Sequence, residues 1–95
     1  MEKKNIVKEK SYSFALRIVN LYKYLTVTKR EYVLSKQILK SGTSIGANIE
    51  ESIGGQSKAD FLSKLSIAYK KARETIYWLK LLHLTDYLSN EMAES

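Results

Sequence analysis

The sequence predicts an all-α protein, and three observations support this fold class. The 95 residues contain no proline and only four glycines, a composition typical of long helices. Apolar residues recur at intervals of three, four and seven, which is the spacing of one helical face. Capping residues and a glycine pair separate these periodic stretches. The length fits one domain over residues 1–95 with a modest hydrophobic core.

The first stretch predicts a helix over about residues 5–25. Its inner face carries apolar residues at helical spacing, namely Val7, Phe14, Ile18, Leu21 and Leu25. The next three residues, Thr26-Val27-Thr28, are β-branched and lose side-chain freedom inside a helix. We therefore expect the first helix to end at Tyr24 or Leu25.

A second helix is predicted over about residues 29–53. Thr28 and Glu31 have the spacing of a capping box, in which both side chains satisfy free backbone N–H groups at a helix start. Gly54-Gly55 ends the helix, since paired glycines are strong breakers. The apolar residues of its inner face are Leu34, Ile38, Ile45, Ile49 and Ile53.

Small residues crowd the middle of this second helix. Gly42 and Gly46 lie four apart, and each costs about 1 kcal/mol relative to alanine in a helix interior. Their missing side chains let a neighbouring helix approach closely, so the segment predicts tight helix packing. It is not a phosphate-binding P-loop, because no Gly-Lys-Ser/Thr follows it.

The third helix is predicted over residues 58–84 and begins with the capping pair Ser57 and Asp60. Thr85-Asp86-Tyr87 predicts a turn. Ser89 is a suitable cap for a fourth helix that starts at about residue 89 and lasts barely one turn. The expected inner stripe of the third helix is Phe61, Leu65, Ala68, Ala72, Ile76 and Leu79.

The long helices also carry apolar residues outside their main stripes. A helix in a monomeric bundle needs one apolar face, so a second face indicates contacts between copies of the chain, although scattered exposed apolar side chains are normal. We expect an oligomer interface that contains Leu16, Val19, Ile67, Tyr77, Trp78 and Leu81.

The formal net charge is +6, and cations recur at helical intervals beside aromatic residues. Such surfaces suit a phosphate backbone, which predicts binding to RNA or DNA. Alternatively, these side chains lie along helix interfaces or only aid solubility. The predicted nucleic-acid-binding residues are Lys10, Arg17, Lys36, Lys40, Lys64, Lys71 and Arg73.

Candidate chemistry is sparse. The chain has no cysteine and one histidine, His83, so it offers neither a Cys–His pair nor metal-ligand spacing. We expect no enzymatic activity, no metal and no cofactor. No stretch is apolar enough to span a membrane, and the charged N-terminus lacks the apolar core of a signal peptide, so we expect a cytoplasmic protein.

The run SKQILKSGTSIGANIEES, residues 35–52, resembles the four-helix-bundle family of 23S rRNA intervening-sequence proteins. Ala72-Arg73-Glu74 and Trp78-Leu79 also match the family pattern, and the resemblance covers about residues 14–88. Within the run, the similar positions are Gln37, Ile38, Lys40, Ser41, Ser44, Ile45, Ala47, Asn48, Ile49 and Glu51.

The resemblance implies an antiparallel up-and-down four-helix bundle that assembles into a ring, typically a homopentamer. It also implies a bacterial origin and RNA or DNA binding, since related accessory proteins of diversity-generating retroelements bind nucleic acid and a reverse transcriptase. The alternative is a protein-interaction scaffold or accessory subunit, for example of a reverse transcriptase, with no direct nucleic-acid role.

The chain departs from the family pattern in two features. Ser52 stands where the family usually has glycine, and the fourth helix is largely missing. A bundle without that helix leaves apolar faces of the other three uncovered. Either oligomer contacts cover these faces, or this chain is a truncated form of a longer protein. We favour truncation and expect this form to be less stable than a longer one.

Overall fold

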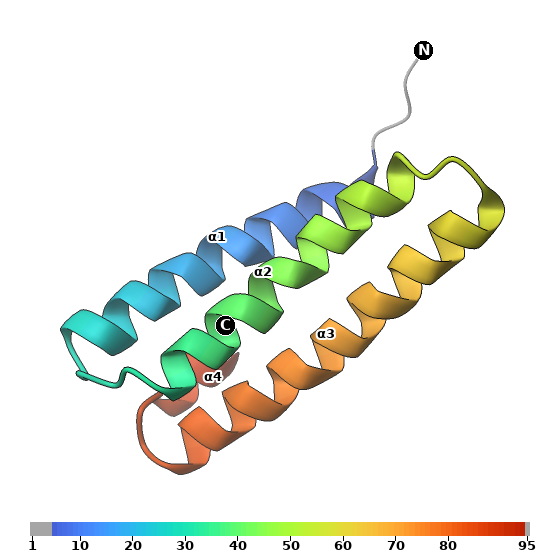
Figure 1. Cartoon of the computed structure of the whole chain (residues 1–95). Coiled ribbons are helices and arrows are strands. Elements are labelled where there is room, and N and C mark those ends of the chain that lie inside the picture. The colour runs from blue at the N-terminus through green and yellow to red at the C-terminus, as the bar shows by residue number, and fades with distance from the viewer. Residues whose placement is uncertain (1–4, 95) are drawn as a thin grey trace.

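The computed structural model describes residues 5–94, which form three long helices and a short fourth (Figure 1). The long helices are α1 (Ile6–Val27), α2 (Leu34–Ile53) and α3 (Lys58–Leu84), and the short one is α4 (Asn90–Glu94). The prediction of an all-α chain is confirmed, because no strand occurs among these residues. The predicted bounds of the third and fourth helices agree with the structure to within one residue.

The predicted end of the first helix is wrong. α1 continues to Val27, and the hydroxyl of Thr26 donates a hydrogen bond to the carbonyl oxygen of Tyr22 at 2.9 Å. This bond to the preceding turn lets a β-branched residue remain inside the helix. The Thr28 N–H also continues the helical pattern by donating to the carbonyl oxygen of Tyr24 at 2.9 Å.

The predicted start of the second helix is also wrong, because α2 begins at Leu34 and not at Lys29. Arg30 has a φ of 54°, in the left-handed region, so the chain turns there and cannot yet be helical. The predicted capping box therefore does not start a helix at Lys29. Glu31 has a different role, described next.

Glu31 caps α2 from three residues before its start. Its buried carboxylate accepts hydrogen bonds from the backbone N–H groups of Val33, Leu34 and Ser35 at 3.2, 3.0 and 2.6 Å. These first-turn donors have no helical carbonyl to bind. Burial raises the pKa of Glu31, but the backbone donors outweigh that effect and hold its pKa below the ordinary value.

α2 is the central helix, and α1 packs along one side of it. Gly42 faces Ile18, and Gly46 faces the backbone of Ser11. Residue numbers therefore rise along α2 as they fall along α1, so the two helices are antiparallel. The glycines allow this close approach, as the sequence predicted.

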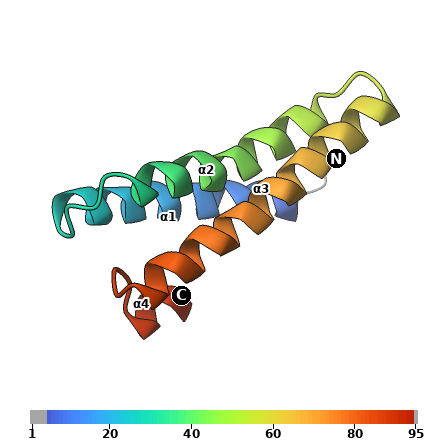
Figure 2. The ribbon, with the colours of Figure 1, turned by 60° about the horizontal axis from the view of Figure 1, so that its bottom comes forward.

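α3 packs on the other side of α2, also antiparallel to it. Near the middle of both helices, the hydroxyl groups of Ser41 and Thr75 lie 2.9 Å apart, fully buried. Near the C-terminal end of α2 and the N-terminal end of α3, Glu51 forms an ion pair with Lys64 at 2.9 Å. Figure 2 shows α3 diverging from the α1–α2 pair towards the end that carries α4.

The predicted inner stripe of the third helix is partly wrong. α3 faces α2 with Ala68, Thr75 and Leu82, which lie seven residues apart and are buried. Phe61 and Ile76 were expected inside but are exposed. Ile53 of α2, also expected inside, is exposed as well. The stripe is rotated towards α2, the long helix whose backbone approaches that of α3 within residues 5–94.

Candidate nucleic-acid interface

The two predicted cations of α2, Lys36 and Lys40, are exposed. They lie on the side of α2 away from its buried Ile38 and Gly42, as their helical spacing requires. Neither has a carboxylate partner among residues 5–94. Their ammonium groups are therefore available to a polyanion.

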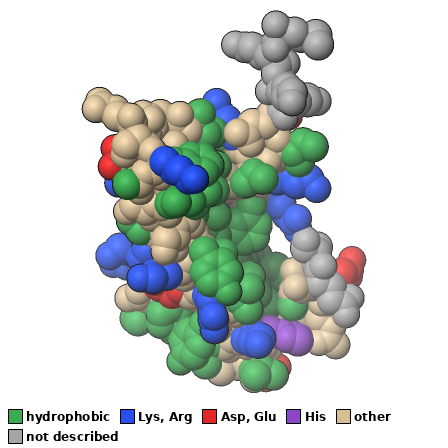
Figure 3. All heavy atoms as spheres, turned by 90° about the vertical axis from the view of Figure 1, so that its right-hand side faces the viewer, with side chains coloured by type: hydrophobic (Ala, Val, Ile, Leu, Met, Phe, Trp, Pro, Cys, Tyr) green, Lys and Arg blue, Asp and Glu red, His purple; other side chains and the backbone are tan. Residues whose placement is uncertain are grey.

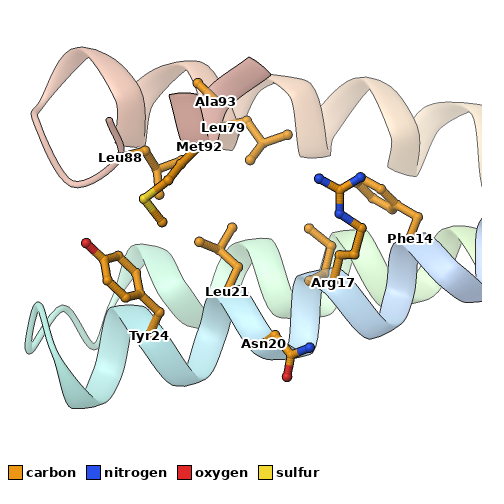
Figure 4. A pocket seen from close by; sticks show the side chains of 10 residues that line it. Phe14, Arg17, Asn20, Leu21, Tyr24, Leu79, Leu88, Met92 and Ala93 are labelled. Atoms are coloured by element: carbon orange, nitrogen blue, oxygen red, sulfur yellow. The ribbon is translucent and has the colours of Figure 1, made fainter. Parts of the chain in front are cut away.

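The two predicted cations of α1 lie beside a groove. A groove of about 380 Å³ opens between α1, the end of α3 and α4. Figure 4 shows Arg17 extending across it beside Phe14, with Leu79 of α3 opposite. Lys10 is exposed one heptad earlier, on the same side of α1. The groove itself is mostly apolar, so Arg17 lies over an apolar surface.

The predicted cations of α3 differ from one another. Lys64 is paired with Glu51 at 2.9 Å, and Lys71 lies 3.7 Å from Glu74. Both are therefore partly neutralised. Arg73 is exposed and has no carboxylate partner in the described residues; its guanidinium carbon lies 5.9 Å from the centre of the Tyr69 ring.

The structure does not gather the seven predicted cations into one site. They lie on three helices and face different directions. Sequence reasoning missed a closer grouping on α3, where Tyr69, Lys70, Arg73, Tyr77 and Lys80 are all exposed. Their spacing of three and four residues could have revealed it, but Tyr77 was predicted as an interface residue and only Arg73 of the five as a nucleic-acid contact. Figure 3, viewed from the side of α3, shows Lys and Arg side chains interleaved with hydrophobic ones.

The predicted oligomer-interface residues divide into two groups. Leu16 and Tyr77 are exposed, as an interface would require of the free chain. Val19, Ile67, Trp78 and Leu81 are only partly exposed. Trp78 packs against the core of its own chain, and its indole N–H donates to Glu74 at 3.1 Å.

The described part of the chain offers little for chemistry. Within residues 5–94 no group of three or more metal-ligating side chains occurs, and no helix is long and apolar enough to cross a membrane. The Nε2 atom of His83 lies 2.6 Å from the Oδ1 atom of Asn90. The histidine thus links the end of α3 to α4.

The fold and these surfaces define a small all-helical protein with exposed basic and aromatic side chains. The chain belongs to the 23S rRNA-intervening sequence protein family, whose family model matches residues 3–95. This confirms the family resemblance of residues 35–52. None of the curated proteins matches the sequence.

A solved structure is similar over most of the chain. It is a crystal structure at 1.70 Å resolution of a protein of unknown function from the S23 ribosomal protein family of Bacteroides thetaiotaomicron. It is 60% identical in sequence, with a TM-score of 0.93, and the match covers 94% of this chain and 82% of that chain.

Proposed function

We propose that this chain is a non-enzymatic, cytoplasmic protein that binds RNA or DNA through its basic surfaces. One observation carries the proposal. The net charge is +6, and five of the seven predicted cations are exposed and have no carboxylate partner among the described residues, namely Lys10, Arg17, Lys36, Lys40 and Arg73. Phosphate groups would supply the missing negative charge. The family description, which names a 23S rRNA element, agrees with an RNA context.

The proposal includes assembly into a homo-oligomer, with a pentameric ring of four-helix bundles as the expected form. Exposed Leu16 supplies apolar surface for subunit contacts. A ring would repeat each basic surface around its axis, so that several weak contacts to one nucleic acid act together.

The test measures fluorescence anisotropy of labelled structured RNA and duplex DNA between about 50 and 200 mM salt. Binding that weakens by orders of magnitude over this range would support the proposal. Absence of binding at low salt, by protein shown to be folded and oligomeric, would overturn it.

The second candidate is a protein-interaction scaffold or accessory subunit, for example of a reverse transcriptase. The exposed apolar residues favour it, since they suit a protein partner as well as another copy of the chain. A stable complex with such a partner in the absence of nucleic acid would support this candidate, and its basic surface would then serve solubility or partner choice.

A further inference from the structure

The outward face of α3 combines aromatic rings and cations without an acidic residue. Tyr69, Lys70, Arg73, Tyr77 and Lys80 share this face by their spacing, and all five are exposed. Tyr69 and Tyr77 are 63% and 59% exposed as whole residues, so both rings are accessible.

The acidic residues of α3 lie elsewhere. Asp60 is in the first turn, well before this face begins. Glu74 is engaged by its own helix, because one carboxylate oxygen lies 3.7 Å from Lys71 and the other accepts the indole N–H of Trp78 at 3.1 Å. The outward face therefore keeps its positive charge.

Neighbouring residues orient the two rings. The guanidinium carbon of Arg73 lies 5.9 Å from the Tyr69 ring centre, within the range of a cation–π interaction. The Tyr77 ring meets the Trp78 indole edge to face, with ring centres 5.1 Å apart and planes at 74°. Trp78 is itself held by the core and by Glu74. The Tyr69 and Tyr77 rings, each held by a neighbouring side chain, therefore lie eight residues apart, about 12 Å along the helix axis.

We propose that this face binds single-stranded RNA or DNA, with unpaired bases stacking on Tyr69 and Tyr77. Arg73, Lys70 and Lys80 would contact the phosphates between them. Duplexes do not offer this contact, since the faces of their bases are already stacked on one another and only base edges and the backbone are accessible. The inference rests on the proposed nucleic-acid binding, and it assigns Tyr77 to the ligand instead of the subunit interface.

The test compares a labelled single-stranded oligonucleotide without self-complementarity with the duplex of the same sequence. Tyr69→Ala and Tyr77→Ala should each weaken single-strand binding about 5- to 100-fold. Duplex binding should change less than about twofold. Tyr69→Phe and Tyr77→Phe keep the stacking ring and should bind like the unmodified protein. Tyr12→Ala, which removes an equally exposed tyrosine of α1, is the matched control and should have no effect.

Three outcomes would overturn the inference. Alanine variants that bind single strands normally would exclude stacking, and equal losses on single strands and duplexes would indicate a general electrostatic effect. A change of oligomeric state in Tyr77→Ala, measured by sedimentation, would make this face a subunit interface. If the unmodified protein binds no nucleic acid at all, the proposed function itself fails. If the unmodified protein binds and the tyrosine substitutions do not change its affinity for single strands, only the stacking site fails.

Discussion

Gly42 of α2 packs directly against the side chain of Ile18 of α1. A Cβ atom on Gly42 would lie 2.8 Å from Cγ1 and 2.9 Å from Cγ2 of Ile18. Both carbons are bonded to the Ile18 Cβ, so no side-chain rotation moves both away. The glycine thus sets the distance between the two helices.

Gly42→Ala should lower the free energy of unfolding by up to about 2 kcal/mol. Overpacking costs about 1–3 kcal/mol, and the better helix propensity of alanine offsets about 1 kcal/mol of it. Urea unfolding measures the difference. Gly54→Ala is the control, since nothing lies within 3.9 Å of its added Cβ, and it should change stability by less than about 0.5 kcal/mol. Equal effects of the two substitutions would contradict the packing role of Gly42.

A second prediction concerns the buried hydroxyl pair between α2 and α3. The Thr75 hydroxyl lies 2.9 Å from the Ser41 oxygen and 2.7 Å from the carbonyl oxygen of Lys71. One hydroxyl hydrogen serves one acceptor at a time. The Thr75 hydroxyl therefore donates to either Ser41 or the Lys71 carbonyl oxygen, and Ser41 in turn donates to either Thr75 or the Ile38 carbonyl oxygen at 3.5 Å. Thr75→Val leaves Ser41 without this partner and should cost about 1–3 kcal/mol.

A double-mutant cycle separates this hydrogen bond from simple loss of packing. Ser41→Ala combined with Thr75→Val should cost less than the sum of the two single variants, because neither hydroxyl then remains unpaired. Additive losses, measured by urea unfolding, would show that the two hydroxyl groups do not depend on each other.

The sequence predicted the parts of the fold that depend on local chemistry. Ser57 and Ser89 cap their helices as expected, each accepting the backbone N–H three residues later at 3.1 Å. The start of α2 could not be predicted this way, since Glu31 caps over a turn whose shape depends on Arg30 at positive φ. A capping-box pattern does not distinguish a residue inside the helix from one that reaches forward to it.

The orientation of α3 was harder to predict, because it is set by contacts between helices. Thr75 is buried against Ser41, whereas Ile76 on the adjacent position is exposed. Hydrophobic periodicity favoured Ile76 as the inner residue and ignored a threonine. The candidate site was hard to predict for the same reason. Lys64 and Lys71 are partly neutralised by carboxylates that the fold brings near them, and a pattern of cations in the sequence does not show these ion pairs.

A third prediction concerns how the segment after α3 closes one end of the core. Leu88 is only 4% exposed and lines the groove next to Leu79. Leu88→Ala should destabilise the protein by about 2–4 kcal/mol, as truncation of a buried leucine does. Leu84→Ala is the matched control, because Leu84 is 78% exposed and should contribute less than about 0.5 kcal/mol. Comparable losses would mean that this segment does not pack on the core in solution.

A fourth prediction compares lysines that have no carboxylate partner among the described residues with lysines that form ion pairs. Replacing both Lys36 and Lys40 with Gln should reduce the salt slope of duplex DNA binding by about 1.8, which is two lost phosphate contacts. The matched pair, Lys64→Gln with Lys71→Gln, should reduce it by less than half as much, since carboxylates already neutralise these side chains in part. Anisotropy titrations at several salt concentrations give both slopes. A larger effect of the second pair would indicate that the nucleic acid binds near the α2–α3 boundary, where Lys64 lies, and not at Lys36 and Lys40.

The last prediction follows from the lowered pKa of Glu31. Because its pKa in the folded state lies below the ordinary value of 4.5, the native carboxylate stays ionised where the unfolded chain is already protonated. Its stabilisation is therefore complete above the unfolded pKa and is lost as the pH falls through the folded pKa. Glu31→Gln should cost about 1–2 kcal/mol near pH 7, since it removes the negative charge at the start of α2 and one acceptor for its N–H groups. The difference between the two proteins should shrink as the pH is lowered to about 3. Urea unfolding across this pH range tests the prediction, and a constant difference between the two proteins would show that ionisation of Glu31 does not stabilise α2.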